Sequence, residues 1–170
     1  NARVVKLLVE ERPTTTINGS ISYGTSVGLV GELKLSDDNF LGRGQSASAT
    51  LSASNKGDKT FELSWFDPWL KGTERVQLGG SFYWTQSVDD NADADEVEKV
   101  RKIGTRWQIG KGLNSDIDVR FIARFDNYKE LFANKKVNDK YKLFAMGPIL
   151  TYDTRDNKFS PTKGFYGTMA

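Results

Sequence analysis

The residues that could carry catalytic chemistry are few, because the 170-residue chain contains no histidine and no cysteine. Without them, neither a Ser/His/Asp nor a Cys/His arrangement can form within this chain, and only a pair of carboxylates remains. The commonest zinc ligand is missing for the same reason. We therefore predict no catalytic residue, no metal site and no cofactor, and we expect that the chain is not an enzyme.

One acidic stretch, residues 86–99, resembles a metal-binding loop in composition only. It reads QSVDDNADADEVEK, without the alternation of a strand. It also lacks the glycine and the terminal glutamate spacing of an EF-hand loop. A solvated connection is the simpler interpretation, and we expect no bound metal there.

Composition excludes two further classes of protein. The 24 basic and 22 acidic residues leave a net charge of +2, which gives no indication of a nucleic-acid partner. No segment approaches the roughly 18 consecutive apolar residues of a membrane helix, although strands that are apolar on one face only remain possible. The chain opens at Asn1 without a signal-peptide pattern, so we expect a processed or excised piece of a longer protein.

The elements that must position any functional side chains are predicted by a two-residue alternation, which is clearest in residues 27–54. Val27, Leu29, Leu33 and Leu35 share one face of the first run, and alternating alanine and serine form the second run after a turn at residues 37–44. Each run approaches the ~9–11 residues that a tilted strand needs to cross a bilayer, against about 5–6 in ordinary globular strands. The pattern therefore predicts a hairpin of membrane-spanning length.

The same alternation predicts eight strands and the start of a ninth. Beyond the hairpin, the predicted strands cover residues 14–23, 59–65, 76–84, 103–109, 117–125, 141–152 and 165–170. Pro148 lacks an N–H donor, so we expect a bulge or a locally unpaired position there. The longest charged connections, residues 86–99 and 126–140, fall on the same side of an up-and-down arrangement. We assign that side to the exterior and the opposite side to the periplasm.

The two faces of these strands differ in a way that favours a barrel over a soluble sandwich. In a sandwich, Trp65, Trp84, Trp107, Phe121 and Phe125 would crowd into one narrow core, whereas in a barrel they face lipid. The opposite face carries charges that we expect to line a wet lumen. These lumen-facing charges are Glu32, Lys34, Glu62, Arg106, Asp118, Arg120 and Arg124. We predict an all-β, antiparallel, up-and-down transmembrane β-barrel.

Four blocks in register over nearly the whole chain carry a family resemblance. They are VEERPTTTINGSISYGTSVG, DDNFLGRGQSASATLSAS, FELSWFDPWLKG and YDTRDNKFSPTKGFYGTMA. Together they resemble the BamA-type outer-membrane protein assembly factors, in which periplasmic POTRA domains precede a 16-stranded barrel that inserts other barrels. The resemblance implies that residues 1–13 end the last POTRA domain and that residues 14–170 form strands one to eight with the start of the ninth. The later half of the family's barrel is absent from this sequence, including the VRGF-type loop and the last strand.

The resemblance also implies a mechanism based on strand pairing at the first barrel strand. That strand carries few bulky groups, so it could part from the last strand of the barrel and accept an incoming strand by β-augmentation. The expected strand-pairing edge consists of Thr16, Ile17, Asn18, Gly19, Ser20, Ile21, Ser22 and Tyr23. The partners implied are membrane lipid, nascent outer-membrane proteins, periplasmic accessory subunits and a second copy of the fragment, in the bacterial outer membrane.

Three alternatives remain at this point. The barrel could be an outer-membrane enzyme that uses a carboxylate pair. It could instead anchor an autotransported protein or form a two-partner secretion pore. It could also be a small structural barrel that is complete with eight strands. The first strand itself could simply be a short and flexible terminal strand.

Overall fold

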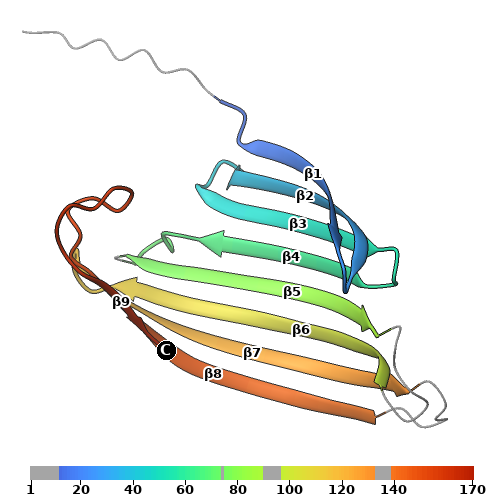
Figure 1. The fold of residues 1–170 in the computed structure, drawn as a ribbon. Coiled ribbons are helices and arrows are strands. Elements are labelled where there is room, and N and C mark those ends of the chain that lie inside the picture. Colours follow the sequence, from blue (N-terminus) through green and yellow to red (C-terminus); the bar gives the residue numbers. More distant parts are fainter. Residues whose placement is uncertain (1–11, 74, 90–96, 133–138) are drawn as a thin grey trace, which may run out of the picture.

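The computed structural model describes residues 12–73, 75–89, 97–132 and 139–170. These residues form one antiparallel sheet in which the strands lie side by side in chain order (Figure 1). Its strands are β1 (Thr15–Gly24), β2 (Gly28–Phe40), β3 (Gln45–Ser54), β4 (Lys59–Asp67), β5 (Val76–Val88), β6 (Val97–Gly112), β7 (Ile117–Phe132), β8 (Asp139–Asp153) and β9 (Tyr166–Met169). The prediction of eight strands and the start of a ninth is confirmed.

Within the described residues, no helix has the length and apolar character needed to cross a membrane.

Several strands are longer than the sequence predicts. β6 and β7 each have 16 residues, so most of the predicted connection at residues 126–140 belongs to strands, as do both ends of the predicted loop at residues 86–99. The pairing ladder continues through these charged residues, for example at Arg101↔Lys129. Backbone hydrogen bonding therefore extends the sheet beyond the apolar part of the pattern, and the prediction of loops at these strand ends was wrong. Residues 90–96 and 133–138 lie outside the described part of the chain.

Two local expectations have definite outcomes. Gly42 and Gly44 have φ values of 68° and 67°, so the turn between β2 and β3 uses the left-handed conformation that favours glycine. Pro148 causes no bulge, because it pairs with Phe121 in an unbroken register between β7 and β8. On its other side, β8 pairs with β9 only from Leu150 to Asp153, so the position facing Pro148 has no strand partner there. Proline has no N–H to donate, and it is tolerated at a position that has a strand partner on one side only.

The sheet is a single layer, which excludes the sandwich. Tyr83 is the only buried hydrophobic residue among those described, and large apolar side chains such as Phe144 and Met146 remain more than 60% exposed. The register places Leu33, Leu51, Phe61 and Trp84 in one row on the same face. We call this apolar face the outward face and the opposite, polar face the inward face.

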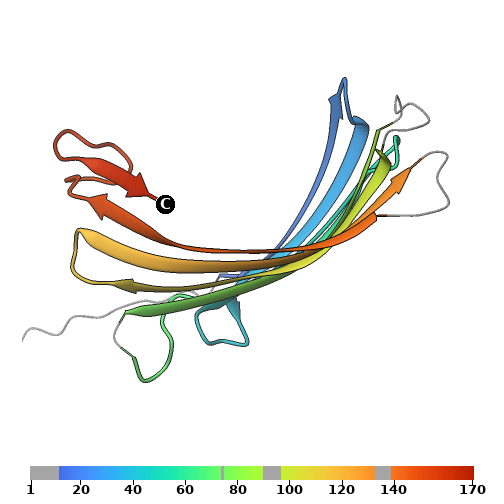
Figure 2. The same cartoon turned by 90° about the horizontal axis from the view of Figure 1, so that it is seen from below.

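The sheet is curved but not closed. Figure 2 shows a bent trough, with β9 and the loop before it turned up at one end. β1 and β9 are the first and last strands in the order, and within the described residues they do not pair with each other. A complete eight-stranded barrel is therefore not what this chain forms, and the expectation of a barrel portion with open edges fits the topology.

Candidate strand-pairing edge

The first strand forms one open edge of the sheet. β1 pairs with β2 from Thr15↔Asp37 to Gly24↔Gly28, and it has no second neighbour among the described strands. About half of the backbone N–H and C=O groups of an edge strand point away from its single partner. All eight predicted edge residues, Thr16 to Tyr23, lie within β1 and are exposed. Their role in pairing with another strand stays a prediction.

Side-chain packing on β1 is sparse. Ile17, Ile21 and Tyr23 are 70%, 81% and 75% exposed. A Cβ added at Gly19 would have no other atom within 4 Å, so the space beside it is open. The ladder from β1 to β2 spans a ten-residue strand, whereas β6 and β7 pair along 16-residue strands. Fewer backbone bonds and fewer side-chain contacts hold β1 than hold the centre of the sheet.

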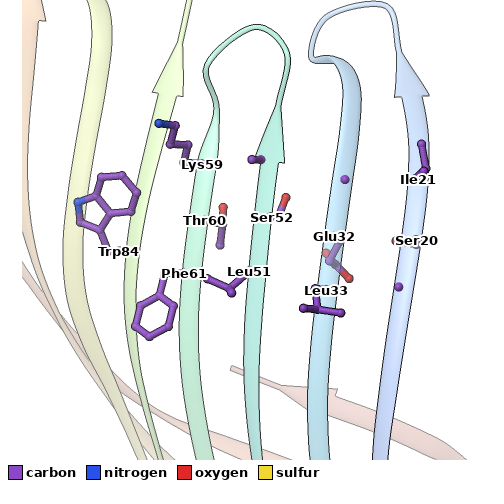
Figure 3. A pocket seen from close by; sticks show the side chains of 13 residues that line it. Ser20, Ile21, Glu32, Leu33, Leu51, Ser52, Lys59, Thr60, Phe61 and Trp84 are labelled. Carbon is purple, nitrogen blue, oxygen red and sulfur yellow. The ribbon is translucent and has the colours of Figure 1, made fainter.

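An apolar hollow of about 860 Å³ lies beside this edge (Figure 3). It forms because small residues, Gly19, Gly31 and Ala53, sit between larger ones on the outward face. Phe61 and Trp84 bound it toward the centre of the sheet, and Lys59 stands at the end nearest the turn at residues 55–58. The open edge and the hollow together give β1 both free backbone groups and an apolar surface.

The seven charges predicted to face the lumen all lie on the inward face. Glu32 is opposite Ser20 and Ser52, Lys34 is opposite Asn18 and Thr50, and Glu62 is opposite Tyr83. Arg106 and Arg124 are direct cross-strand neighbours. Arg120 forms an ion pair with Asp118 at 3.1 Å from Nε to Oδ1. The register thus gathers the β6 and β7 charges into one group and leaves Glu32 and Lys34 apart, near β1. That this face lines a lumen stays a prediction.

A buried polar cluster at the centre of the inward face was missed by the sequence analysis. Asp126 is fully buried, and its carboxylate accepts a hydrogen bond from the Tyr83 hydroxyl, which belongs to a strand two positions away. The strand between them contributes Gly104, which pairs with both residues and has no side chain to separate them. Arg124 completes the cluster with its Nε 3.0 Å from Asp126 Oδ2. The signal was the continuing alternation at Asp126, which the sequence analysis placed in a loop.

This cluster ties three neighbouring strands together with side chains as well as backbone bonds. A buried carboxylate that is paired and hydrogen-bonded holds its partners in one arrangement. Lys102 Nζ and the Arg106 guanidinium carbon lie 5.2 and 5.9 Å from the centre of the Tyr83 ring, where cations are attracted to the aromatic face. β5 to β7 are therefore the firm part of the sheet, and β1 is the weakly held part.

Metal binding finds no support in the described residues. They contain no group of three or more His, Cys, Asp and Glu side chains placed to hold a metal ion. Half of the acidic stretch considered for that role, residues 90–96, lies outside them.

Comparison with known proteins gives two findings. The family model described as the Omp85 superfamily domain matches residues 39–170. A similar solved structure is the crystal structure of BamA from Haemophilus ducreyi lacking POTRA domains 1–3, with a TM-score of 0.69 and 19% sequence identity. The match covers 90% of this chain and 32% of that one, so this chain spans about a third of the structure that it resembles.

Proposed function

The chain belongs to the Omp85 superfamily, and from this membership we propose that it is the first half of a 16-stranded outer-membrane barrel that inserts other barrel proteins. The proposed working element is β1, which pairs with a strand of the incoming protein. The observation that carries the proposal is the free, exposed and thinly packed edge at Thr16 to Tyr23. Residues 1–13 are proposed to end a preceding POTRA domain.

The physical basis of the proposed activity is the cost of unpaired backbone groups in lipid. In the hydrocarbon region each unsatisfied N–H or C=O costs several kcal/mol, so an open strand edge has a strong tendency to acquire a partner. An incoming strand satisfies these groups by β-augmentation, and its own edge then becomes the template for the next strand. No covalent bond is made or broken, so the mechanism fits a non-enzymatic barrel.

The difference in packing across the sheet supports β1 as the strand that exchanges partners. Opening at β1 would disturb few side-chain contacts, because Gly19 has none and Ile17 and Ile21 are mostly exposed. Opening between β5 and β7 would break the buried contacts of Asp126 with Tyr83 and Arg124. Local opening occurs where buried contacts are fewest.

Locking β1 in the full-length parent protein tests this proposal. Gly19→Cys would be paired with a cysteine in the last strand of the parent barrel, and this chain contributes no native cysteine that could interfere. The matched control is Ala49→Cys with Leu63→Cys, two facing positions on β3 and β4 that are not proposed to separate.

We expect the oxidised β1 lock to stop insertion of substrate barrels and reduction to restore it, while the control lock has no effect. Unchanged insertion with β1 locked would refute strand exchange at this edge. If the locked protein instead exported a soluble passenger at the normal rate, the barrel would be a secretion pore that does not open at β1.

A further inference from the structure

Five cationic side chains gather at one end of the outward face. The register aligns Lys59 with Gln86, Gln86 with Arg101, Arg101 with Lys129 and Lys129 with Lys140 across β4 to β8. Lys142 follows two residues along β8 and therefore lies on the same face. We call Lys59, Arg101, Lys129, Lys140 and Lys142 the basic row. The sequence analysis placed Lys129 and Lys140 in a loop, so it did not predict that these residues align with Arg101 across neighbouring strands.

Within the part of the chain that the structure describes, no carboxylate pairs with the basic row on its own face. None of its members forms an ion pair among the described residues, and the Arg101 side chain donates a hydrogen bond from Nε to Gln86 Oε1 at 2.9 Å. Of the described acids at these strand ends, Glu130 and Asp139 face each other and by alternation lie on the inward face, Glu98 forms an ion pair with Lys99 at 2.6 Å, and Asp58 bonds to Ser54. Like charges directly opposite each other destabilise a sheet. Arg101, Lys129 and Lys140 face one another in succession, so an anion from outside the sheet would relieve the repulsion between them.

The surroundings of the basic row have the layout of a membrane interface. At the next outward position β4 and β6 carry Phe61 and Ile103, whereas β7 and β8 still carry Asn127 and Lys142. Phe125 and Phe144 follow one position later, so the face changes from cationic to apolar within two steps. The opposite end of the outward face carries only one strand cation in the described residues, Lys111. The apolar hollow beside β1 begins under Lys59 (Figure 3). Cations above and apolar groups below match a lipid headgroup above its acyl chains.

We propose that the basic row binds the phosphate groups of net-anionic lipids in the leaflet at this end of the barrel, with an acyl chain in the hollow below Lys59. Ammonium and guanidinium groups form charge-assisted hydrogen bonds with phosphate oxygens. A zwitterionic lipid offers less, because its own ammonium group neutralises the phosphate. Lipid binding needs no substrate protein, so this proposal does not depend on strand exchange at β1.

Lipid selection by the full-length parent protein tests the proposal. The protein would be reconstituted into bilayers of phosphatidylglycerol and phosphatidylcholine with identical acyl chains, and native mass spectrometry would count the lipids of each kind that remain bound. The test variant carries Lys59→Gln, Arg101→Gln, Lys129→Gln, Lys140→Gln and Lys142→Gln. The control removes the same number of charges elsewhere, with Arg43→Gln, Lys71→Gln, Lys111→Gln, Lys158→Gln and Lys163→Gln.

We expect the wild type and the control to retain phosphatidylglycerol preferentially and the test variant to lose that preference. A cation near a membrane surface contributes roughly a five-fold effect on anionic lipid binding, so the five changes together should exceed ten-fold. Replacing the five cations by the other cationic residue, lysine by arginine and arginine by lysine, should keep the preference.

Two outcomes would overturn the proposal: equal retention of both lipids by the wild type, or an unchanged preference in the test variant. If the test variant with all five substitutions does not fold, as judged by heat-modifiable gel migration, the double variant Lys129→Gln with Lys140→Gln replaces it. That pair removes two facing cations and should lower the preference severalfold.

Discussion

The rigidity that we assign to the centre of the sheet depends on one glycine, and replacing it gives a sharp prediction. A Cβ at Gly104 would lie 2.8 Å from the Phe125 carbonyl oxygen and 2.9 Å from Tyr83 Cε2, and it would also overlap the Asp126 carboxylate. Neither the backbone nor the buried carboxylate can yield easily. Gly104→Ala should therefore push Tyr83 away from Asp126 and break the buried hydrogen bond between them.

The size of the effect follows from two contributions. Overpacking a well-filled site costs about 1–3 kcal/mol. Leaving a buried polar group without its partner costs about 1–3 kcal/mol more. We expect Gly104→Ala to lower the free energy of unfolding by about 2–6 kcal/mol, which at about 1–3 kcal/mol per M moves the urea midpoint by about 0.7 M or more. Gly19→Ala is the matched control, because its Cβ meets nothing within 4 Å and should change stability by less than about 0.5 kcal/mol.

The assay is urea unfolding of the full-length parent in detergent, followed by heat-modifiable gel migration. A double-mutant cycle with Tyr83→Phe adds a second readout, because Tyr83→Phe already removes the hydroxyl that Gly104→Ala displaces. The two changes together should cost less than their sum by about 0.5–3 kcal/mol. Equal destabilisation by Gly104→Ala and Gly19→Ala, or strictly additive effects in the cycle, would refute the reasoning.

Three further predictions concern other parts of the chain. Gly80→Ala should destabilise the sheet less than Gly104→Ala, by about 1 kcal/mol, because the Trp107 ring 2.8 Å from the new Cβ is half exposed and can turn away; urea unfolding measures it. Pro148→Ala should change the unfolding free energy by less than about 1 kcal/mol, since no β9 residue pairs at that position, and a larger loss would contradict the half-open geometry. In the loop between β8 and β9, a hydrogen bond from the Thr162 hydroxyl and bonds from the Lys163 and Thr162 backbone N–H groups lower the pKa of Asp156 from 3.8 to about 2. Because the pKa of Asp156 is lower in the folded loop, the carboxylate should stabilise the loop fully above about pH 4, and this stabilisation should be lost as the pH falls through 2. Hydrogen exchange of the Thr162 amide measures the change, and Asp156→Asn should abolish this pH dependence.

The alternation of side chains was sufficient to predict the strands, their order and the two faces. It worked because apolar residues such as Leu33, Leu51 and Phe61 recur with a period of two, whatever lies on the neighbouring strand. It failed at strand ends, where Arg101, Lys129 and Lys140 keep the period but not the polarity. A charged residue at an outward position resembles a loop residue when only the apolar pattern is followed.

The inward cluster could not be predicted from one strand at a time. Tyr83, Gly104 and Asp126 meet only because the register sets them opposite one another across three strands, and the register follows from turn geometry and pairing. The β1 edge was different, since its lack of bulky side chains is visible in the sequence itself. What the structure adds at β1 is the open hollow and the absence, among the described residues, of any second neighbour.

The most direct test of the central claim is cross-linking between β1 and a substrate caught during insertion. The full-length parent would carry Gly19→Cys on β1 or, as a control, Leu63→Cys on the interior strand β4, and the substrate would carry single cysteines along its terminal strand. We predict disulfides from Gly19→Cys at one register of the substrate strand, with reactive positions two residues apart, and none from Leu63→Cys. Cross-links of equal yield from both positions, or none from β1 while substrate is inserted normally, would contradict the proposal that β1 is the strand-pairing edge.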